Sequence, residues 1–78
     1  MRTLKAPMPG VFYRRPSPGD PVFVEEGAPV EVGQTIGLIE VMKNFNQLKA
    51  DAAGTVTRFL LEDEDEVMIG QDVVELEE

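Results

Sequence analysis

The sequence predicts an all-β protein, a flattened antiparallel barrel or sandwich that forms one domain over residues 1–78. Glycine or proline recurs through the first 37 residues, so no long window carries the apolar period of a helix. Short apolar runs alternate with Gly, Pro and acidic turn signals, which is typical of strands. An internal repeat relates the two halves of the chain and indicates approximate twofold symmetry.

Each expected strand is a short run with apolar residues that is bounded by Gly, Pro or acidic residues. In chain order the expected strands are residues 2–5, a short run near 11–13, and residues 22–25, 35–41, 44–50, 55–61 and 72–76. Their number and spacing fit a small barrel or sandwich.

Charge is unevenly distributed along the chain. The charged side chains before Asp20 are all basic, whereas residues 62–78 hold nine acids and no base. This asymmetry predicts that the first and last strands pair with each other. The acidic run Glu62–Glu66 is interpreted as a solvated turn, with an acidic recognition patch as the alternative.

Composition argues against several classes of function. The net charge of −8 disfavours nucleic-acid binding, which needs clustered Lys and Arg. The chain has no Cys and no His, so we expect no disulfide and no metal site, and the reducing cytoplasm is the expected compartment. No apolar run approaches the roughly 20 residues that span a bilayer, and the N-terminal residues do not resemble a signal peptide, so no membrane association is expected.

The repeat also locates an insertion. Val30–Ile36 matches Val67–Val73 at an offset of 37, and both copies contain a Gly-Gln pair. Ala6–Gly10 matches Ala50–Gly54 at an offset of 44. The first half therefore carries seven extra residues, which fall within residues 13–21.

The insertion contains three prolines, which exclude a central strand. One interpretation is a surface loop, since loops lengthen at small entropic cost. The other is a rigid projection that contacts a partner or a bound group. Prolines would stiffen it, and Arg14 and Arg15 would offer fixed donors.

The junction between the halves places Lys43 at the tip of a hairpin, with the two chain termini together at the opposite end. A two-residue turn would put Met42 and Lys43 where φ must be positive, although neither is glycine. Such a turn costs on the order of 1–3 kcal/mol, and strain of this kind marks functional sites. Alternatively, Lys43 is an ordinary exposed lysine and the turn lies elsewhere.

Several motifs together carry a family resemblance. They are the Ala6–Gly10 and Ala50–Val56 segments, the Phe12–Gly19 segment, Val30–Gln34, and Glu40-Val41-Met42-Lys43. The sequence resembles the biotinyl/lipoyl attachment family, and within it the biotin carboxyl carrier domains of acetyl-CoA carboxylase, which act in fatty acid biosynthesis. The resemblance covers nearly the whole chain.

The resemblance implies a fold, the barrel-sandwich hybrid of two four-stranded sheets, and a cofactor, biotin, in amide linkage to Lys43. Glu40, Val41 and Met42 would complete the attachment motif. Residues 13–21 resemble the thumb of these carriers, and donors near Ser17 would reach the biotin ring.

The resemblance further implies that the chain is a carrier without catalytic residues. Its partners would be a biotin protein ligase, a biotin carboxylase and a carboxyltransferase. The residues next to the lysine, Val41-Met42 and Asn44, depart from the common Ala-Met-Lys-Met or Ala-Met-Lys-Leu pattern. Two alternatives stay open, a lipoyl-type acyl carrier and an unmodified β-barrel interaction module. Met42 favours biotin over lipoate, because lipoyl domains place Asp before the lysine.

Overall fold

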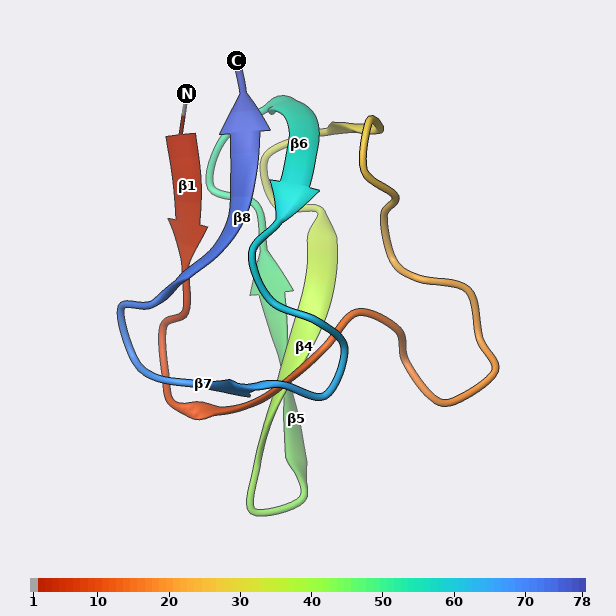
Figure 1. Cartoon of the computed structure of the whole chain (residues 1–78), viewed down its shortest axis with the longest axis vertical. Helices are drawn as coiled ribbons and strands as arrows, with labels where there is room; N and C mark the ends of the chain where they lie inside the picture. The colour runs from red at the N-terminus through yellow and green to blue at the C-terminus, as the bar shows by residue number, and fades with distance from the viewer. Residues whose placement is uncertain (1) are drawn as a thin grey trace.

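The computed structural model describes residues 2–78, which form eight strands. Their bounds are β1 Arg2–Lys5, β2 Gly10–Tyr13, β3 Pro29–Val30, β4 Thr35–Val41, β5 Asn44–Lys49, β6 Gly54–Phe59, β7 Glu66–Val67 and β8 Asp72–Glu77. They build two four-stranded antiparallel sheets with the orders β1-β8-β6-β3 and β5-β4-β2-β7 (Figure 1). The predicted all-β fold with two four-stranded sheets is confirmed. In the described part of the chain, no helix is long and apolar enough to cross a membrane.

The two halves of the internal repeat make equivalent hydrogen bonds at the turns around Gly33 and Gly70. Gly33 and Gly70 both have positive φ, 87° and 81°, and their N–H groups donate to the carbonyls of Ala50 and Ala6, each at 2.8 Å. A glutamine follows each of these glycines. Its side-chain oxygen accepts the backbone N–H of the residue three positions before the glutamine. The repeated Gly-Gln pair therefore makes the same turn in both halves.

A second pair of glycines allows close approach between strands. A Cβ on Gly10 would lie 2.4 Å from the Glu40 carbonyl oxygen, and a Cβ on Gly54 would lie 2.7 Å from that of Glu77. Glu40 and Glu77 are themselves 37 residues apart, so the two crossings are equivalent. Both glycine pairs thus occupy matching places, as the repeat predicts.

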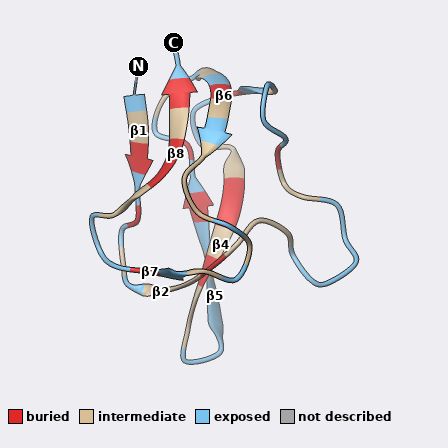
Figure 2. Ribbon diagram, viewed as in Figure 1, coloured by how far each residue is buried: buried red, intermediate tan, exposed pale blue. Residues whose placement is uncertain are grey.

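The core lies between the two sheets, where the inward-facing residues of both meet (Figure 2). The repeat-related residues Ile36 and Val73 are fully buried there, as are Leu76 and, within one per cent, Ile39. The whole buried set is Leu4, Ala6, Phe12, Val24, Val30, Ile36, Ile39, Leu48, Ala50, Val56, Val67, Val73, Val74 and Leu76.

The strand assignment needs one correction, because residues 22–25 are not a strand. Val24 is buried, but the described backbone bond of Phe23 runs from its N–H to the carbonyl of Arg14, the residue after β2, at 2.8 Å. The apolar Val-Phe-Val run therefore reflects burial without a strand ladder. Two strands were missed, β3 and β7, because each spans only two residues.

The terminal strands pair antiparallel, with Arg2 opposite Leu76 and Thr3 opposite Glu75, as the charge asymmetry predicts. An ion pair joins Lys5 of β1 to Asp72 of β8 at 2.5 Å. Figure 1 shows both ends of the chain on one side of the molecule and the β4–β5 hairpin protruding on the other. The predicted placement of Lys43 opposite the termini is confirmed.

Candidate functional site

The β4–β5 hairpin ends in a turn of two residues. Val41 pairs with Asn44, and the two residues between them, Met42 and Lys43, have φ of 51° and 69°. Positive φ at both central residues defines a type I′ turn, whose twist suits the flanking strands. The sequence-based prediction of a strained turn without glycine is confirmed, and the alternative of a shifted turn is wrong.

Glu40 stabilises this turn from the strand below it. Its carboxylate Oε2 accepts the backbone N–H of Lys43 at 2.6 Å. A hydrogen bond to a charged acceptor is stronger than a neutral one, so Glu40 offsets part of the strain. Met42 is 87 per cent exposed and Lys43 is also exposed, so the turn presents both residues to solvent.

Two hollows lie near the hairpin and share Phe45 as a wall. The larger, of about 580 Å³, is lined by Met8, Pro9, Val41, Met42, Asn44, Phe45 and Asn46. The smaller, of about 270 Å³, is lined by Tyr13, Arg15, Pro16, Ser17, Pro18, Phe45, Asp63 and Glu64. We call the smaller hollow the thumb groove, because one wall consists of the insertion, residues 13–21, which we call the thumb.

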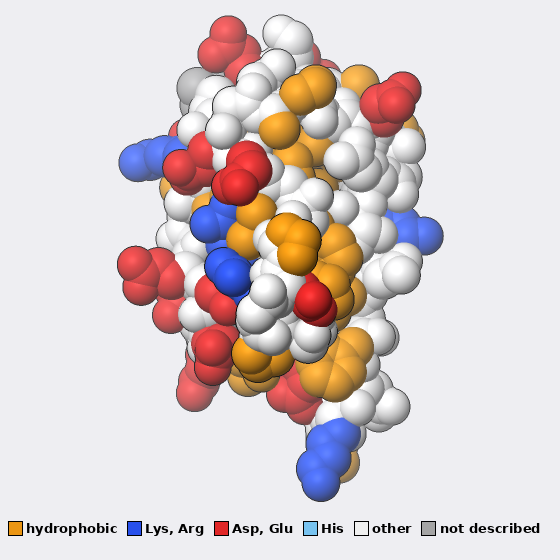
Figure 3. All heavy atoms as spheres, turned by 90° about the vertical axis from the view of Figure 1, so that its right-hand side faces the viewer, with side chains coloured by type: hydrophobic (Ala, Val, Ile, Leu, Met, Phe, Trp, Pro, Cys, Tyr) orange, Lys and Arg blue, Asp and Glu red, His pale blue; other side chains and the backbone are white. Residues whose placement is uncertain are grey.

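The thumb folds toward the hairpin. The rings of Tyr13 and Phe45 are in contact, with centroids 5.9 Å apart, and Phe45 is only two residues from Lys43. Figure 3 views the molecule from the side on which the chain of the thumb runs in Figure 1, and hydrophobic side chains gather down the middle of that face. Ser17 therefore lines the same groove as Phe45 of β5, whereas Val41 and Met42 line the larger hollow, and Glu40 and Lys43 line neither.

The hydroxyl of Ser17 is already engaged within the thumb. It donates to the carboxylate of Asp20, and the Asp20 backbone N–H donates to the Ser17 carbonyl at 3.1 Å. Ser17 lines the thumb groove, but its hydroxyl proton is used by Asp20. A ligand in the groove would find an acceptor at Ser17 Oγ more readily than a donor.

Residues 2–76 match the family described as "Biotin-requiring enzyme". The chain belongs to this family. It is 46 per cent identical over 66 residues to a chloroplastic biotin carboxyl carrier protein of acetyl-CoA carboxylase from Glycine max. The matched segment covers 85 per cent of this chain and 25 per cent of the relative.

Biotin carboxyl carrier proteins of acetyl-CoA carboxylase from Pyropia yezoensis and Haemophilus influenzae are similar as well. Each is 39 per cent identical, over 75 and 74 residues, which is 96 and 95 per cent of this chain and 48 per cent of each relative. This member of the biotin-requiring family therefore spans between a quarter and a half of the length of these relatives.

For a member of the biotin-requiring family, the described residues fit covalently bound biotin. Among residues 2–78, no ion pair involves the Lys43 amine, so it is free for amide formation. The thumb groove combines aromatic walls with a few polar groups, which is what a small ring with a polar edge requires.

Sequence reasoning missed three residues of the thumb groove, which are Phe45, Asp63 and Glu64. The acidic run is a turn, as expected, but Asp63 points inward and accepts the Arg14 N–H at 2.7 Å. Glu64 has φ of 72° and stands 37 residues after Gly27, whose φ is 91°. The repeat offset would have identified this position as one that requires positive φ.

Proposed function

We propose that this chain is a biotin carrier of acetyl-CoA carboxylase and that biotin is attached to the Nζ atom of Lys43. The observation that carries the proposal is the type I′ turn, which holds a lysine without glycine neighbours at the exposed tip of a hairpin. The names of the relatives support the assignment to acetyl-CoA carboxylase.

The chain's own contribution to attachment is geometric. Glu40 holds the backbone of Lys43, and the tip of the hairpin extends beyond the sheets so that a biotin protein ligase can enclose it. The Lys43 amine attacks the carboxyl carbon of biotin that the ligase has activated as an acyl-adenylate. The new C–N bond forms as the C–O bond to AMP breaks, AMP leaves, and the ligase accepts the amine proton. No residue of the carrier acts as a catalyst in this proposal.

Bound biotin supplies a ureido nitrogen that accepts and releases a carboxyl group. The carrier presents it in turn to a biotin carboxylase and a carboxyltransferase, the partners that we propose for this chain. A tether raises the local concentration of the group at both active sites without tight docking. The net charge of −8 supports weak and rapid exchange and disfavours nucleic acid.

We also propose that the thumb is a seat for the biotin ring. The thumb groove, with Ser17 in one wall and Phe45 in the other, lies within two residues of the attachment lysine along β5. The cytoplasm is the compartment that we propose for the chain, because a protein without cysteine needs no oxidising environment.

The attachment site is tested by co-expression with a biotin protein ligase, followed by intact-mass measurement and a streptavidin blot. The Lys43→Arg variant should carry no adduct and keep the wild-type Tm, because an exposed turn side chain typically contributes within about ±0.5 kcal/mol. Lys49→Arg is the matched control, since Lys49 is an exposed lysine at the other end of β5. It should be labelled as the wild type is.

The same measurement separates the alternatives. An adduct with the mass of lipoate would identify a lipoyl-type carrier, and no adduct in the wild type would favour an unmodified interaction module. Streptavidin signal that persists in Lys43→Arg would show that the attachment site is wrong.

A further inference from the structure

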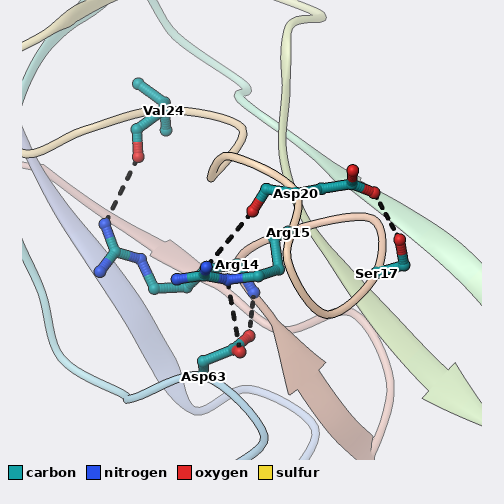
Figure 4. A network of polar contacts seen from close by, with 6 residues as sticks. All are labelled: Arg14, Arg15, Ser17, Asp20, Val24 and Asp63. Carbon is teal, nitrogen blue, oxygen red and sulfur yellow. Dashed lines mark hydrogen bonds and ion pairs between the residues drawn. The ribbon is translucent and has the colours of Figure 1, made fainter.

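A network of polar contacts surrounds the base of the thumb (Figure 4). The Phe23 N–H donates to the Arg14 carbonyl at 2.8 Å, which closes the thumb into a loop. Beside this closure, Asp63 Oδ1 accepts the Arg14 backbone N–H at 2.7 Å, and Asp63 Oδ2 lies 3.6 Å from Arg15 Nε. One carboxylate from the turn before β7 thus contacts two consecutive thumb residues.

The two arginines hold different parts of the thumb. The Arg15 guanidinium donates to the Asp20 carbonyl at 3.3 Å, so it connects Asp63 to the far limb of the thumb. The Arg14 guanidinium turns the other way, 4.1 Å above the Phe59 ring, and donates to the Val24 carbonyl at 3.4 Å. Both limbs of the thumb are therefore tied to the barrel through one pair of arginines.

The other half of the molecule has a counterpart without a thumb. Glu26, which is 37 residues before Asp63, accepts the backbone N–H of Phe59 at the end of β6, at 2.9 Å. An acidic side chain that holds a backbone amide at the end of a strand is thus a feature of both halves. Only at Asp63 does the same carboxylate also face a cation from an inserted segment.

We propose that Asp63 is a positioning residue that fixes the thumb against the barrel and thereby sets the shape of the thumb groove. Asp63 and Arg15 both line this groove, so the contact that holds the thumb is also part of the groove wall. The Asp63 side chain is 27 per cent exposed and that of Arg15 is 36 per cent exposed, so the pair is less screened than a fully solvated one.

The first test measures thumb mobility without biotin. In Asp63→Ala, amide hydrogen exchange and ¹⁵N relaxation are recorded at Ser17, Gly19 and Asp20, since the thumb prolines have no N–H. We expect exchange roughly tenfold faster at the Asp20 amide, which donates to the Ser17 carbonyl at 3.1 Å, and lower ¹⁵N order parameters at Ser17 and Gly19, because one charge-assisted hydrogen bond and one ion pair are lost. The Arg14 amide, which Asp63 binds directly, should also lose protection.

Glu26→Ala is the matched control. It removes the equivalent backbone acceptor, at Phe59, and should lower Tm by a similar amount while leaving thumb exchange unchanged. Equal acceleration of thumb exchange in both variants would show general loosening and overturn the proposal. Wild-type thumb exchange in Asp63→Ala would overturn it as well.

A milder variant keeps the test decisive if Asp63→Ala does not fold. Arg15→Gln removes the cation but leaves Asp63 to accept the Arg14 N–H. Exchange at the Asp20 amide and ¹⁵N mobility at Ser17 and Gly19 should increase, while the Arg14 amide stays protected. Unchanged exchange at Asp20 together with unchanged mobility at Ser17 and Gly19 would contradict the role of the Arg15–Asp63 pair.

The consequence for the cofactor rests on the proposed function and is measured separately on biotinylated protein. If the ring sits in the thumb groove, its NMR relaxation in Asp63→Ala should show more mobility than in wild type and in Glu26→Ala. Faster thumb exchange with unchanged ring mobility would leave Asp63 as the residue that fixes the thumb and would refute the groove as the seat of biotin.

Discussion

At the scale of single residues, backbone strain gathers where the candidate site lies. Among residues 2–78, three non-glycine residues have positive φ, and they are Met42, Lys43 and Glu64. Two form the tip of the hairpin and the third lines the thumb groove. Each such residue costs about 1–2 kcal/mol relative to a right-handed conformation. These strained positions coincide with the exposed turn and the groove wall, which supports a role beyond folding.

Asp72 provides a prediction about pH at this scale. A hydrogen bond from Lys5, with its charge and a weaker bond from Thr3, lowers the pKa of the Asp72 carboxyl below its usual value. Because the folded pKa is lowered, the contact stabilises the fold above the unfolded pKa of about 4, and this contribution is lost as pH falls through the folded pKa. In Lys5→Met, the pKa of Asp72 should return toward its usual value.

The measurement is an NMR titration of the Asp72 side-chain carbon between neutral pH and about pH 2. Lys49→Met is the control, because Lys49 lies on β5 and makes no contact with Asp72 in the described ion pairs. If Asp72 titrates in the wild type at or above the usual value for aspartate, the contact between β1 and β8 is weaker than the structure indicates.

At the scale of elements, the hairpin depends on how closely β2 crosses β4. A Cβ on Gly10 would lie 2.4 Å from the Glu40 carbonyl oxygen and 2.8 Å from the Ile39 Cγ2. In Gly10→Ala the strands must separate, which should cost about 1–3 kcal/mol. Since Glu40 also holds the Lys43 amide, we expect slower ligase labelling as well.

Gly54→Ala isolates the effect on the hairpin. A Cβ there would lie 2.7 Å from the Glu77 carbonyl oxygen, at the equivalent crossing near the termini. Both variants should show lower Tm in thermal melts, by roughly 4–8 °C for each kcal/mol. Only Gly10→Ala should label more slowly. Equal labelling rates in the two variants would mean that the base of the hairpin does not influence the turn.

The same elements show what sequence can and cannot predict. The hairpin and the glycine turns followed from the internal repeat, and the paired termini followed from the charge asymmetry between the two ends of the chain. Residues 22–25 misled, because burial of Val24 gives the same apolar signal as a strand. Asp63 was missed because its partners, Arg14 and Arg15, are 49 and 48 residues away, and only the fold brings them together.

At the scale of the whole molecule, the two ends of the barrel differ in chemistry. The described chain measures 33 × 27 × 20 Å along its principal axes. The hairpin with Lys43 lies at one end and the paired strands β1 and β8 lead to the other (Figure 1). A partner can therefore enclose the lysine without disturbing the terminal strands, which is what the proposed carrier function requires.

Because both sheets contribute to one core, we expect the core to unfold as a single cooperative unit. Substitutions at Ile36 and at its repeat counterpart Val73 test this expectation. Both side chains are fully buried in the one core cluster. Ile36→Ala should cost about 2–5 kcal/mol, and Ile36→Val only about 0.5–1.5 kcal/mol, because fewer buried methyl groups are removed. A domain of this size has a total stability of roughly 4–12 kcal/mol, so the alanine variant could lose most of it.

Urea unfolding of Ile36→Ala, Ile36→Val and Val73→Ala, followed by far-ultraviolet circular dichroism and by NMR signals from both sheets, measures these losses. We expect Val73→Ala to be destabilising as well, but somewhat less than Ile36→Ala because it removes two buried carbons instead of three, although the two positions lie in different sheets. In each variant both sheets should unfold at one urea concentration, since their inner faces share one core. Separate transitions for the two sheets would contradict this, and would mean that each half is stabilised by its own contacts and that the hairpin can remain folded when the terminal strands do not.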